Sequence, residues 1–363
     1  MSDKQSQKAG DGSTQLIAKE VNLNIGITEE RAREVYRELE QRSIEQYSRE
    51  ADEKIKERLI AAIEPIVCKM REYDSAFEQF NDPAFQYVIR NVQATASRTD
   101  SKDDYEMLAE LLGQHIEHKD DRIITSTVSE AIKIVDQIDV YSLQVLTCVY
   151  AILDIKFLNP STKKLLYDMN GHIEQVLPEE LPNTQEWVNH LDMLKLVRYN
   201  SISQFKSLKD IFNTTYTDNI VTGIKKDSDN YELVRKMFPN DEVFSAFMVD
   251  NDLLDGYVKL IINEDNVNNG QVYQLINIDF ISLVGSILEH KKTIQGYYDK
   301  DTNILQQVQN NFMVKFNSYP KLKAFNDWIS SLNYSFDLTP LGRLIANINL
   351  KRYVPNLPIF YKK

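Results

Sequence analysis

Hydrophobic and polar residues repeat with a helical period over the first long stretch of the chain, residues 28–81. The apolar positions from the middle of this stretch onward are Ile44, Tyr47, Ala51, Ile55, Leu59, Ala62, Ile63, Ile66, Met70 and Tyr73. Steps of three and four residues keep such positions on one face of a helix. About 50 helical residues extend roughly 75 Å, so we predict one long amphipathic helix whose apolar face needs a partner.

The ends and the middle of this predicted helix carry signals of their own. Thr28 is a favourable N-cap, and the acidic residues that follow it suit the positive end of the helix dipole. Pro65 lacks a backbone donor, so we expect a kink or a break near residues 61–64. We place the end of the helix near Asn81.

The residues ahead of the helix follow a different pattern. Residues 1–12 are polar and are expected to be disordered. Between residues 21 and 27, apolar side chains alternate with asparagine and glycine, which is the period of a β-strand. A single strand cannot satisfy its own backbone. We therefore expect this leader strand to pair with the same stretch of another subunit, to pair with another sheet, or to remain disordered.

Helical patterns continue through most of the remaining chain. Residues 83–97, 105–118, 123–137 and 140–158 are predicted as further helices. In the second half, helices are predicted over residues 161–176, 185–197, 231–238, 242–262, 273–290, 302–316 and 341–349, with a loop or weak hairpin at 213–230, a turn at 263–270 and a strand at 334–338. The expected fold is mainly α, with a flexible leader (residues 1–27), a long helix plus helical bundle (residues 28–158) and a mostly α C-terminal domain with a short β element (residues 159–363).

Composition excludes several classes of protein. The net charge of −12 argues against general affinity for nucleic acid or an anionic membrane, because both need clustered Lys and Arg. The most apolar segment, residues 140–158, contains Asp154 and Lys156, so we expect a buried helix rather than a membrane span. Cys68 and Cys148 are too few for a disulfide framework and are predicted to be reduced core residues. With no apolar signal segment, we expect a cytoplasmic protein.

The spacing most like that of a metal site is His115 and His118. Two imidazoles at positions i and i+3 of a helix can face one ion, and Asp120 or Asp121 could assist them. The pattern identifies no third ligand, and histidines at a helix C-terminus also complement the helix dipole. A metal-dependent hydrolase or nuclease around this pair is therefore an alternative hypothesis.

Two acidic segments superficially resemble calcium loops. Residues 250–252 and 263–266 are rich in Asp, Asn and Glu. Neither follows the alternating pattern of oxygen ligands, because Leu254 occupies the fifth position of the first and Val267 interrupts the second. We interpret both as solvated helix ends and turns. We assign no catalytic, cofactor-binding or metal-binding residue, and we expect no cofactor.

A strand followed by a capped helix closes the chain. Residues 334–338 alternate like a strand, and Thr339-Pro340 then caps a helix, an arrangement that resembles the wing of winged-helix regulators. Such a DNA binder needs a basic recognition helix before the wing, and residues 307–323 offer only Lys315, Lys321 and Lys323. A β-α unit that closes the domain is the other interpretation. DNA binding through Lys315 and Arg343 remains an alternative hypothesis.

Several segments resemble proteins of bacterial defence. The start, Gly10-Asp11-Gly12-Ser13-Thr14-Gln15, resembles the Gly-Asp-x-Ser-x-Gln leader of bacterial defence and signalling proteins. Residues 85–87, 123–153, 191–197 and 336–342 resemble segments of the Abi-alpha-like abortive-infection proteins, a helical family. This resemblance implies a setting in anti-phage defence, and it carries over no catalytic residue.

The leading hypothesis is a non-enzymatic cytosolic helical protein that acts by self-association. Residues 31–73 would form a homo-oligomer as a coiled coil, and the leader strand could add to the contact, since burial of each apolar side chain is worth roughly 1.5–3 kcal/mol. Packing of the same face against residues 83–158 competes with this arrangement. Other proteins could also be partners of the chain. We expect it to bind neither a membrane nor a nucleic acid.

Overall fold

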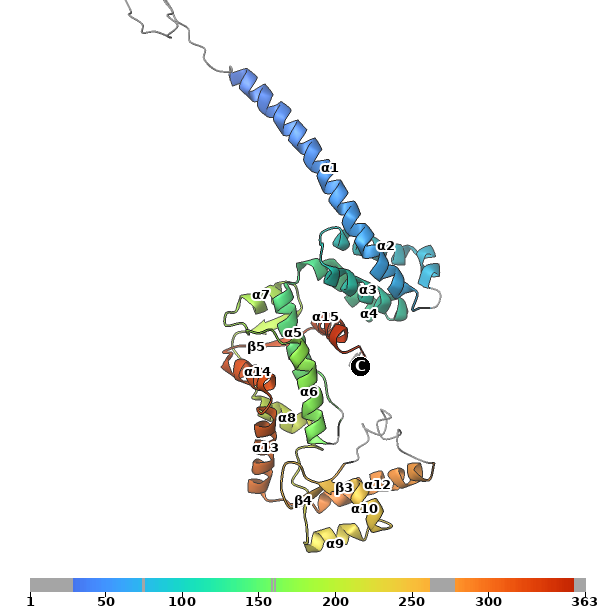
Figure 1. Ribbon diagram of the computed structural model, residues 1–363, viewed down its shortest axis with the longest axis vertical. Coiled ribbons are helices and arrows are strands. Elements are labelled where there is room, and N and C mark those ends of the chain that lie inside the picture. Colours follow the sequence, from blue (N-terminus) through green and yellow to red (C-terminus); the bar gives the residue numbers. More distant parts are fainter. Residues whose placement is uncertain (1–28, 74–75, 158, 160, 262–277, 356–363) are drawn as a thin grey trace, which may run out of the picture. The chain divides into compact units, whose positions relative to one another are not determined.

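The computed structural model of the 363-residue chain describes residues 29–73, 76–157, 159, 161–261 and 278–355 (Figure 1). Helix makes up 66% of the interpretable part of the chain, which confirms the expected mainly α fold with few short strands. By its internal contacts the chain divides into two units, residues 1–57 and 58–363. The predicted leader strand at residues 21–27 and the predicted turn at residues 263–270 lie outside the described residues.

The first element is a long helix, as the hydrophobic pattern predicts. α1 (Glu29–Met70) is continuous and contains Pro65, so the chain is not split at residues 61–64. Pro65 removes only the bond that a backbone N–H at this position would donate to the carbonyl of Ala61, and the helix continues for five residues beyond it. No helix within the described residues is long and apolar enough to cross a membrane.

α1 ends before the predicted Asn81, and its last turn lies against a later helix. A Cβ atom at Gly113 would lie 2.9 Å from the Tyr73 hydroxyl and 3.0 Å from Cε of Lys69. The missing side chain therefore gives these two residues room as the chain turns. A short 3₁₀ helix, η1 (Ala76–Asn81), follows the turn.

The next five helices occur in the predicted order, although the fourth ends at Leu153 and not at the predicted residue 158. They are α2 (Pro83–Ala96), α3 (Lys102–Glu117), α4 (Arg122–Ile134), α5 (Val140–Leu153) and α6 (Thr162–Val176). Each begins after an Asp or Ser whose side chain accepts a backbone N–H of the first turn: Asp82, Ser101, Asp121, Asp139 and Ser161. A 3₁₀ turn, η2 (Val135–Gln137), follows α4. Local capping chemistry thus sets these boundaries.

The second half contains more short elements than the pattern indicates. They are α7 (Glu186–Met193), β1 (Val197–Asn200), α8 (Leu208–Thr215), β2 (Ile224–Lys225), α9 (Asp229–Arg235), α10 (Asp241–Phe247), β3 (Met248–Asp250), β4 (Tyr257–Leu260), α12 (Ile278–Gly296), α13 (Thr302–Phe316), α14 (Pro320–Ser331), β5 (Ser335–Leu338) and α15 (Pro340–Tyr353). Neither α8 nor α14 is predicted as a separate helix, and the predicted helix at residues 185–197 ends early.

The predicted helix over residues 242–262 is wrong. The segment forms α10 and then two strands, with β3 and β4 paired antiparallel in the register Met248 to Leu260. α10 ends at Phe247, and Gly256, with a left-handed φ of +76°, lies in the turn immediately before the return strand β4. β2 pairs with the other edge of β4, giving the order β2-β4-β3.

The strand and helix predicted at the end of the chain are confirmed. β5 pairs antiparallel with β1, and Thr339 caps α15 by accepting the N–H of Gly342 at 3.0 Å. A Cβ atom at Gly342 would lie only 1.9 Å from the carbonyl oxygen of Leu196. Glycine is therefore required where α15 crosses the start of β1.

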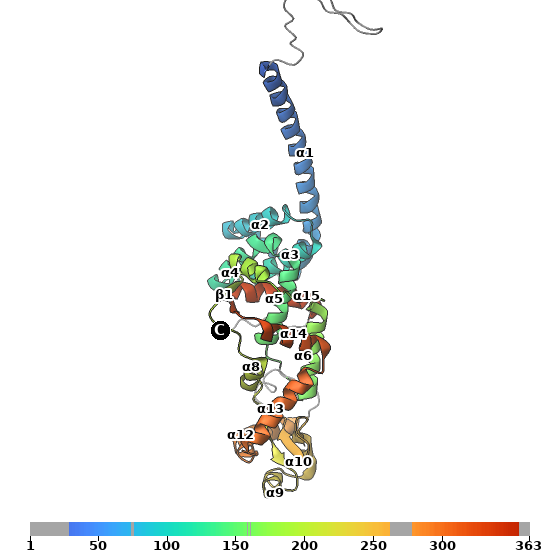
Figure 2. The ribbon, with the colours of Figure 1, turned by 90° about the vertical axis from the view of Figure 1, so that its left-hand side faces the viewer.

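Buried apolar side chains form two clusters in the described residues. The main cluster runs from Ala62 to Leu350 and contains residues from both sides of the boundary expected near residue 158. The second cluster is Ile224, Val234, Phe238, Phe244, Phe247, Met248, Val258, Leu260, Ile287 and Ile294. We call residues 224–260 and 287–298 the small lobe; both views place it beside one end of α13 (Figures 1 and 2).

The two cysteines have different surroundings. Both are free thiols; Cys148 is buried in α5, as expected, whereas Cys68 is exposed on α1. The prediction of a core position is therefore wrong for Cys68. Its thiol donates to Glu64 at 3.3 Å, and this bond, together with desolvation, raises the thiol pKa.

Candidate functional site

An apolar groove lies between the last turns of α1 and the segment formed by η1 and α2. Its volume is about 240 Å³. The residues that line it are Leu59, Ala62, Ile63, Ile66, Val67, Met70, Phe80, Ile89, Val92, Gln93 and Ala96. Gln93 is the polar member of this set. Apart from Val67, the α1 residues of the groove come from the hydrophobic stripe that predicts the helix.

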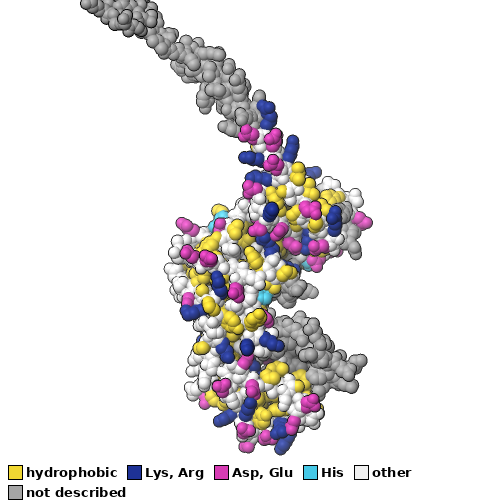
Figure 3. All heavy atoms as spheres, in the orientation of Figure 1, with side chains coloured by type: hydrophobic (Ala, Val, Ile, Leu, Met, Phe, Trp, Pro, Cys, Tyr) yellow, Lys and Arg dark blue, Asp and Glu magenta, His cyan; other side chains and the backbone are white. Residues whose placement is uncertain are grey.

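Part of the groove wall remains open to solvent. The Ile63 side chain is 54% exposed and Phe80 is 40% exposed, whereas Ala62 and Met70 beside them are buried. Figure 3 shows hydrophobic side chains gathered over the last turns of α1. An uncovered apolar surface of this kind is typical of a protein interaction site. Packing within the chain therefore covers only part of the stripe.

Polar contacts fix α1 at both ends of the groove. The Arg58 guanidinium donates to the carbonyl of Ser97, which ends α2, at 3.1 Å. At the other end the Lys69 ammonium pairs with Glu110 on α3 at 2.9 Å and with Glu72 at 2.8 Å. Burial alone would lower the pKa of Lys69, but its bonds to Glu72 and Glu110 outweigh burial and raise it. The groove is thus held in a defined shape.

The turns of α1 that precede residue 58 carry charges of both signs. The side chains of residues 48–57 are all exposed. The charged ones are Arg49, Glu50, Asp52, Glu53, Lys54, Lys56 and Glu57. Figure 3 shows acidic and basic side chains mixed on this stretch. Such a surface suits contact with another mixed-charge helix better than contact with a uniformly charged polymer.

The two histidines predicted as alternative metal ligands have separate environments. The His115 ring lies 6.1 Å from that of Phe85, and its Nδ1 is buried with no hydrogen-bond partner among the described residues. Desolvation lowers the pKa of His115, and Asp82 opposes this shift. The Nδ1 atom of His118 lies 3.2 Å from the carbonyl oxygen of Gln114. Within the described ranges, no group of three or more His, Cys, Asp and Glu residues could hold a metal ion.

The two residues named for DNA binding lie on different helices, Lys315 on α13 and Arg343 on α15. Arg343 pairs through Nε with Asp154, the residue that follows the last turn of α5, at 2.7 Å, and this ion pair partly neutralises its charge. Lys315 is exposed on α13. In the described part of the chain, β5 pairs with β1, and α15 begins directly after β5. The DNA-binding hypothesis therefore remains a prediction, in which Lys315 is the exposed cation available to a phosphate.

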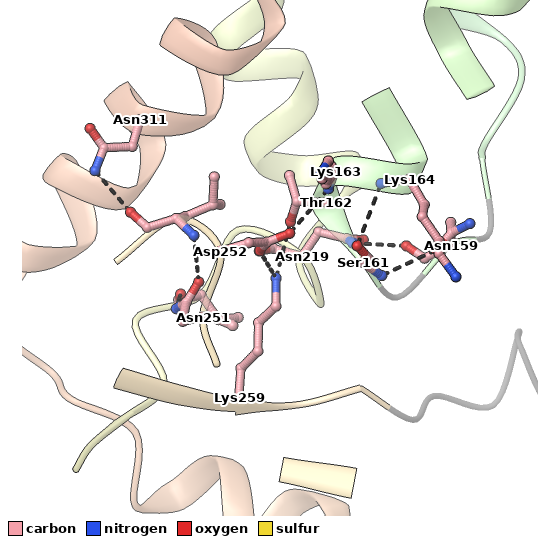
Figure 4. A network of polar contacts seen from close by, with 12 residues as sticks. Asn159, Ser161, Thr162, Lys163, Lys164, Asn219, Asn251, Asp252, Lys259 and Asn311 are labelled. Atoms are coloured by element: carbon pink, nitrogen blue, oxygen red, sulfur yellow. Dashed lines mark hydrogen bonds and ion pairs between the residues drawn. The ribbon is translucent and has the colours of Figure 1, made fainter. Parts of the chain in front are cut away.

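Sequence reasoning missed a buried ionic network, drawn in Figure 4. Lys259 on β4 is 1% exposed. Its ammonium donates to Asp252 at 2.8 Å, to the Thr162 hydroxyl at 3.0 Å and to the carbonyl of Asn219 at 3.3 Å. Burial lowers the pKa of Lys259, while Asp252 opposes the shift. The signal in the sequence is a single Lys inside the apolar run Tyr257–Leu260.

In the partner segment, residues 250–252, Asp250 is exposed, whereas Asn251 and Asp252 are held by contacts within the chain and do not form a solvated turn. Asn251 is buried and donates to the carbonyls of Val221 and Thr222, each at 2.8 Å. Asp252 also accepts the backbone N–H of Lys163 at 3.0 Å. Burial alone would raise the pKa of Asp252, but the Lys259 charge and these hydrogen bonds lower it. The acidic pattern that resembles a calcium loop instead serves an internal ion pair.

Comparisons with known proteins give one match. The model of an uncharacterised protein family matches residues 26–360. The matched range begins just ahead of α1 and includes every described helix and strand. Neither a curated protein nor a solved structure matches the chain.

Proposed function

The chain belongs to this uncharacterised family, and we propose that it acts in the cytoplasm as a non-enzymatic protein that self-associates through α1. The observation that supports this proposal is the apolar groove with Ile63 and Phe80 exposed in it. Each such side chain gains roughly 1.5–3 kcal/mol on full burial. A partner that covers the groove is therefore favoured over water.

We propose α1 of a second copy as the occupant. Ile60 and Ile63 are exposed and Val67 is half-buried, and they follow one another in steps of three and four residues, which is the spacing of a coiled-coil seam. The exposed charges of residues 48–57 have both signs, so two copies related by a two-fold axis can place opposite charges against each other. Each copy then uses the same surface of α1 to contact the other copy.

The test is the oligomeric state of the full-length chain by sedimentation velocity over a range of concentrations. We expect a dimer or larger oligomer for the wild type. Ile63→Glu should weaken association at least about tenfold, because it places a carboxylate in an apolar contact. The matched control is Ile123→Glu on α4, which changes an isoleucine that is 77% exposed outside the groove.

The two substitutions together show whether the groove makes the contact between copies. The control should associate like the wild type. A wild type that stays monomeric at the highest concentration would refute self-association. Equal weakening by both substitutions would mean that added negative charge, rather than the groove, controls association.

We further propose that self-association serves anti-phage defence. The support is the resemblance of residues 85–87, 123–153, 191–197 and 336–342 to abortive-infection proteins. Bacteria that express the intact chain should then survive phage challenge better than bacteria that express Ile63→Glu. The Ile123→Glu variant should protect like the wild type. Equal survival with and without the intact chain would reject the defence role and leave self-association untouched.

A further inference from the structure

Strand β4 presents two different faces to its surroundings. Val258 and Leu260 belong to the apolar cluster of the small lobe. Tyr257 and Lys259 alternate with them, so they lie on the opposite face, where Tyr257 joins the main cluster and Lys259 reaches Thr162 on α6. Of the two β4 residues on this face, Tyr257 thus presents an aromatic ring and Lys259 an ammonium group.

Further contacts between the small lobe and the rest of residues 58–355 are also polar. On α12, Lys291 and Gln295 donate to the Asp218 carboxylate at 3.2 and 3.3 Å. An apolar anchor comes from the turn between β3 and β4, where Leu253 and Leu254 pack into the main cluster. Interfaces with this polar character permit relative motion more readily than a continuous apolar core does.

The chain enters and leaves the small lobe through two segments that are bonded to each other. The Thr222 hydroxyl donates to the carbonyl of Asp299 at 2.7 Å, and the Asp299 N–H donates to the carbonyl of Gly223 at 2.8 Å. Gly223 has a φ of +81°, a conformation in which glycine is favoured. A paired crossing with a glycine can act as a hinge, since few backbone angles need to change there.

We propose that the small lobe opens as one body about the Thr222–Gly223 and Asp299 crossing. The latch that holds it closed is the Lys259–Asp252 pair together with its bonds to groups outside the lobe, which are the Thr162 hydroxyl, the Asn219 carbonyl and the Lys163 N–H. Opening returns both charges to water, which repays the desolvation that the closed state requires. In Figure 4 the Lys259 side chain extends from β4 directly toward Asp252 and the start of α6. The latch therefore acts where the lobe meets α6.

The experiment is hydrogen exchange of the full-length chain, read by mass spectrometry. In the Lys259→Ala variant, amides of residues 224–260 should exchange on the order of 100-fold faster, because loss of one partner leaves Asp252 without its cation. Amides of α3 and α5 should keep their wild-type rates. The matched control is Lys226→Ala, which removes the exposed Lys226–Asp250 pair inside the lobe and should leave all rates unchanged.

A second variant keeps the proposal testable if Lys259→Ala folds poorly. Replacing the whole pair, as Lys259→Met with Asp252→Asn, should leave the lobe as protected as in the wild type, since an apolar contact takes over from the ion pair. In the wild type itself the slowest amides of the lobe should exchange faster than those of α3 and α5. Equal wild-type rates, or a uniform acceleration of the lobe, α3 and α5 in Lys259→Ala, would overturn the proposal.

Discussion

His115 shows how a single residue can have a different role from the one that its spacing suggests. The pattern with His118 resembles a metal site, but the side chain lies beside Phe85 with Nδ1 buried and unpartnered among the described residues. A sequence gives the helical spacing of two imidazoles and not the neighbours that bury one of them. His115 is better described as a packed ring whose protonation is unfavourable.

This description predicts a pH dependence of stability. Desolvation makes the pKa of His115 lower in the folded chain than the ordinary value of about 6.5 in the unfolded chain. The unfolded chain therefore binds more protons near that pH, and the free energy of unfolding should fall as pH drops below about 6.5. Urea unfolding at pH 7.5 and 5.5 should show a smaller loss for His115→Phe than for the wild type. An identical loss in the His115 variant would contradict this account.

Lys259 marks the limit of residue-level prediction. A lysine is normally exposed, and the apolar residues around it fit a helix and a strand equally well. Only the pairing of β3 with β4 shows that Lys259 and Asp252 lie on segments that return past each other. The contact depends on tertiary structure, so spacing along the chain could not reveal it.

At the scale of elements, helix starts could be predicted from their N-cap residues, whereas the strands in segment 242–262 could not be predicted. Helices α2 to α6 begin at Asp or Ser caps that the sequence displays openly. The segment 242–262 has enough apolar residues for a helix, but Gly256 divides it into strands. The apolar period alone cannot distinguish these outcomes in a short run. The groove could be anticipated only as an apolar stripe, because η1 and α2 complete it.

The cap of α15 gives an element-scale prediction. The Thr339 hydroxyl accepts the N–H of Gly342 and donates to the carbonyl of Lys195 at 2.7 Å. Thr339→Ala should therefore lower the free energy of unfolding by about 1–2 kcal/mol, measured by urea titration. Thr339→Ser retains the hydroxyl and should recover most of the loss. Equal losses in the two variants would show that the methyl group, and not the cap, matters.

At the scale of the whole molecule, the main cluster contains residues from both sides of the boundary predicted near residue 158. α15, the last helix, packs on α5 and α4, so the end of the chain completes the core begun by the first helices. Contacts of such large sequence separation leave no local signal. The mainly α class could be predicted because it depends on helical period and composition, which are local properties.

The net charge of the chain predicts how salt affects self-association. Each copy carries a net charge of −12, so two copies repel each other at long range, and salt screens this repulsion over about 10 Å at 0.1 M and about 3 Å at 1 M. Burial of Ile63 and its neighbours is insensitive to such screening. Sedimentation equilibrium of the full-length chain should therefore show tighter association at about 0.5 M than at about 0.05 M NaCl, by roughly threefold or more. Weaker association at high salt would instead assign the contact to ion pairs between the charged turns at residues 48–57, with the apolar groove as a minor contributor.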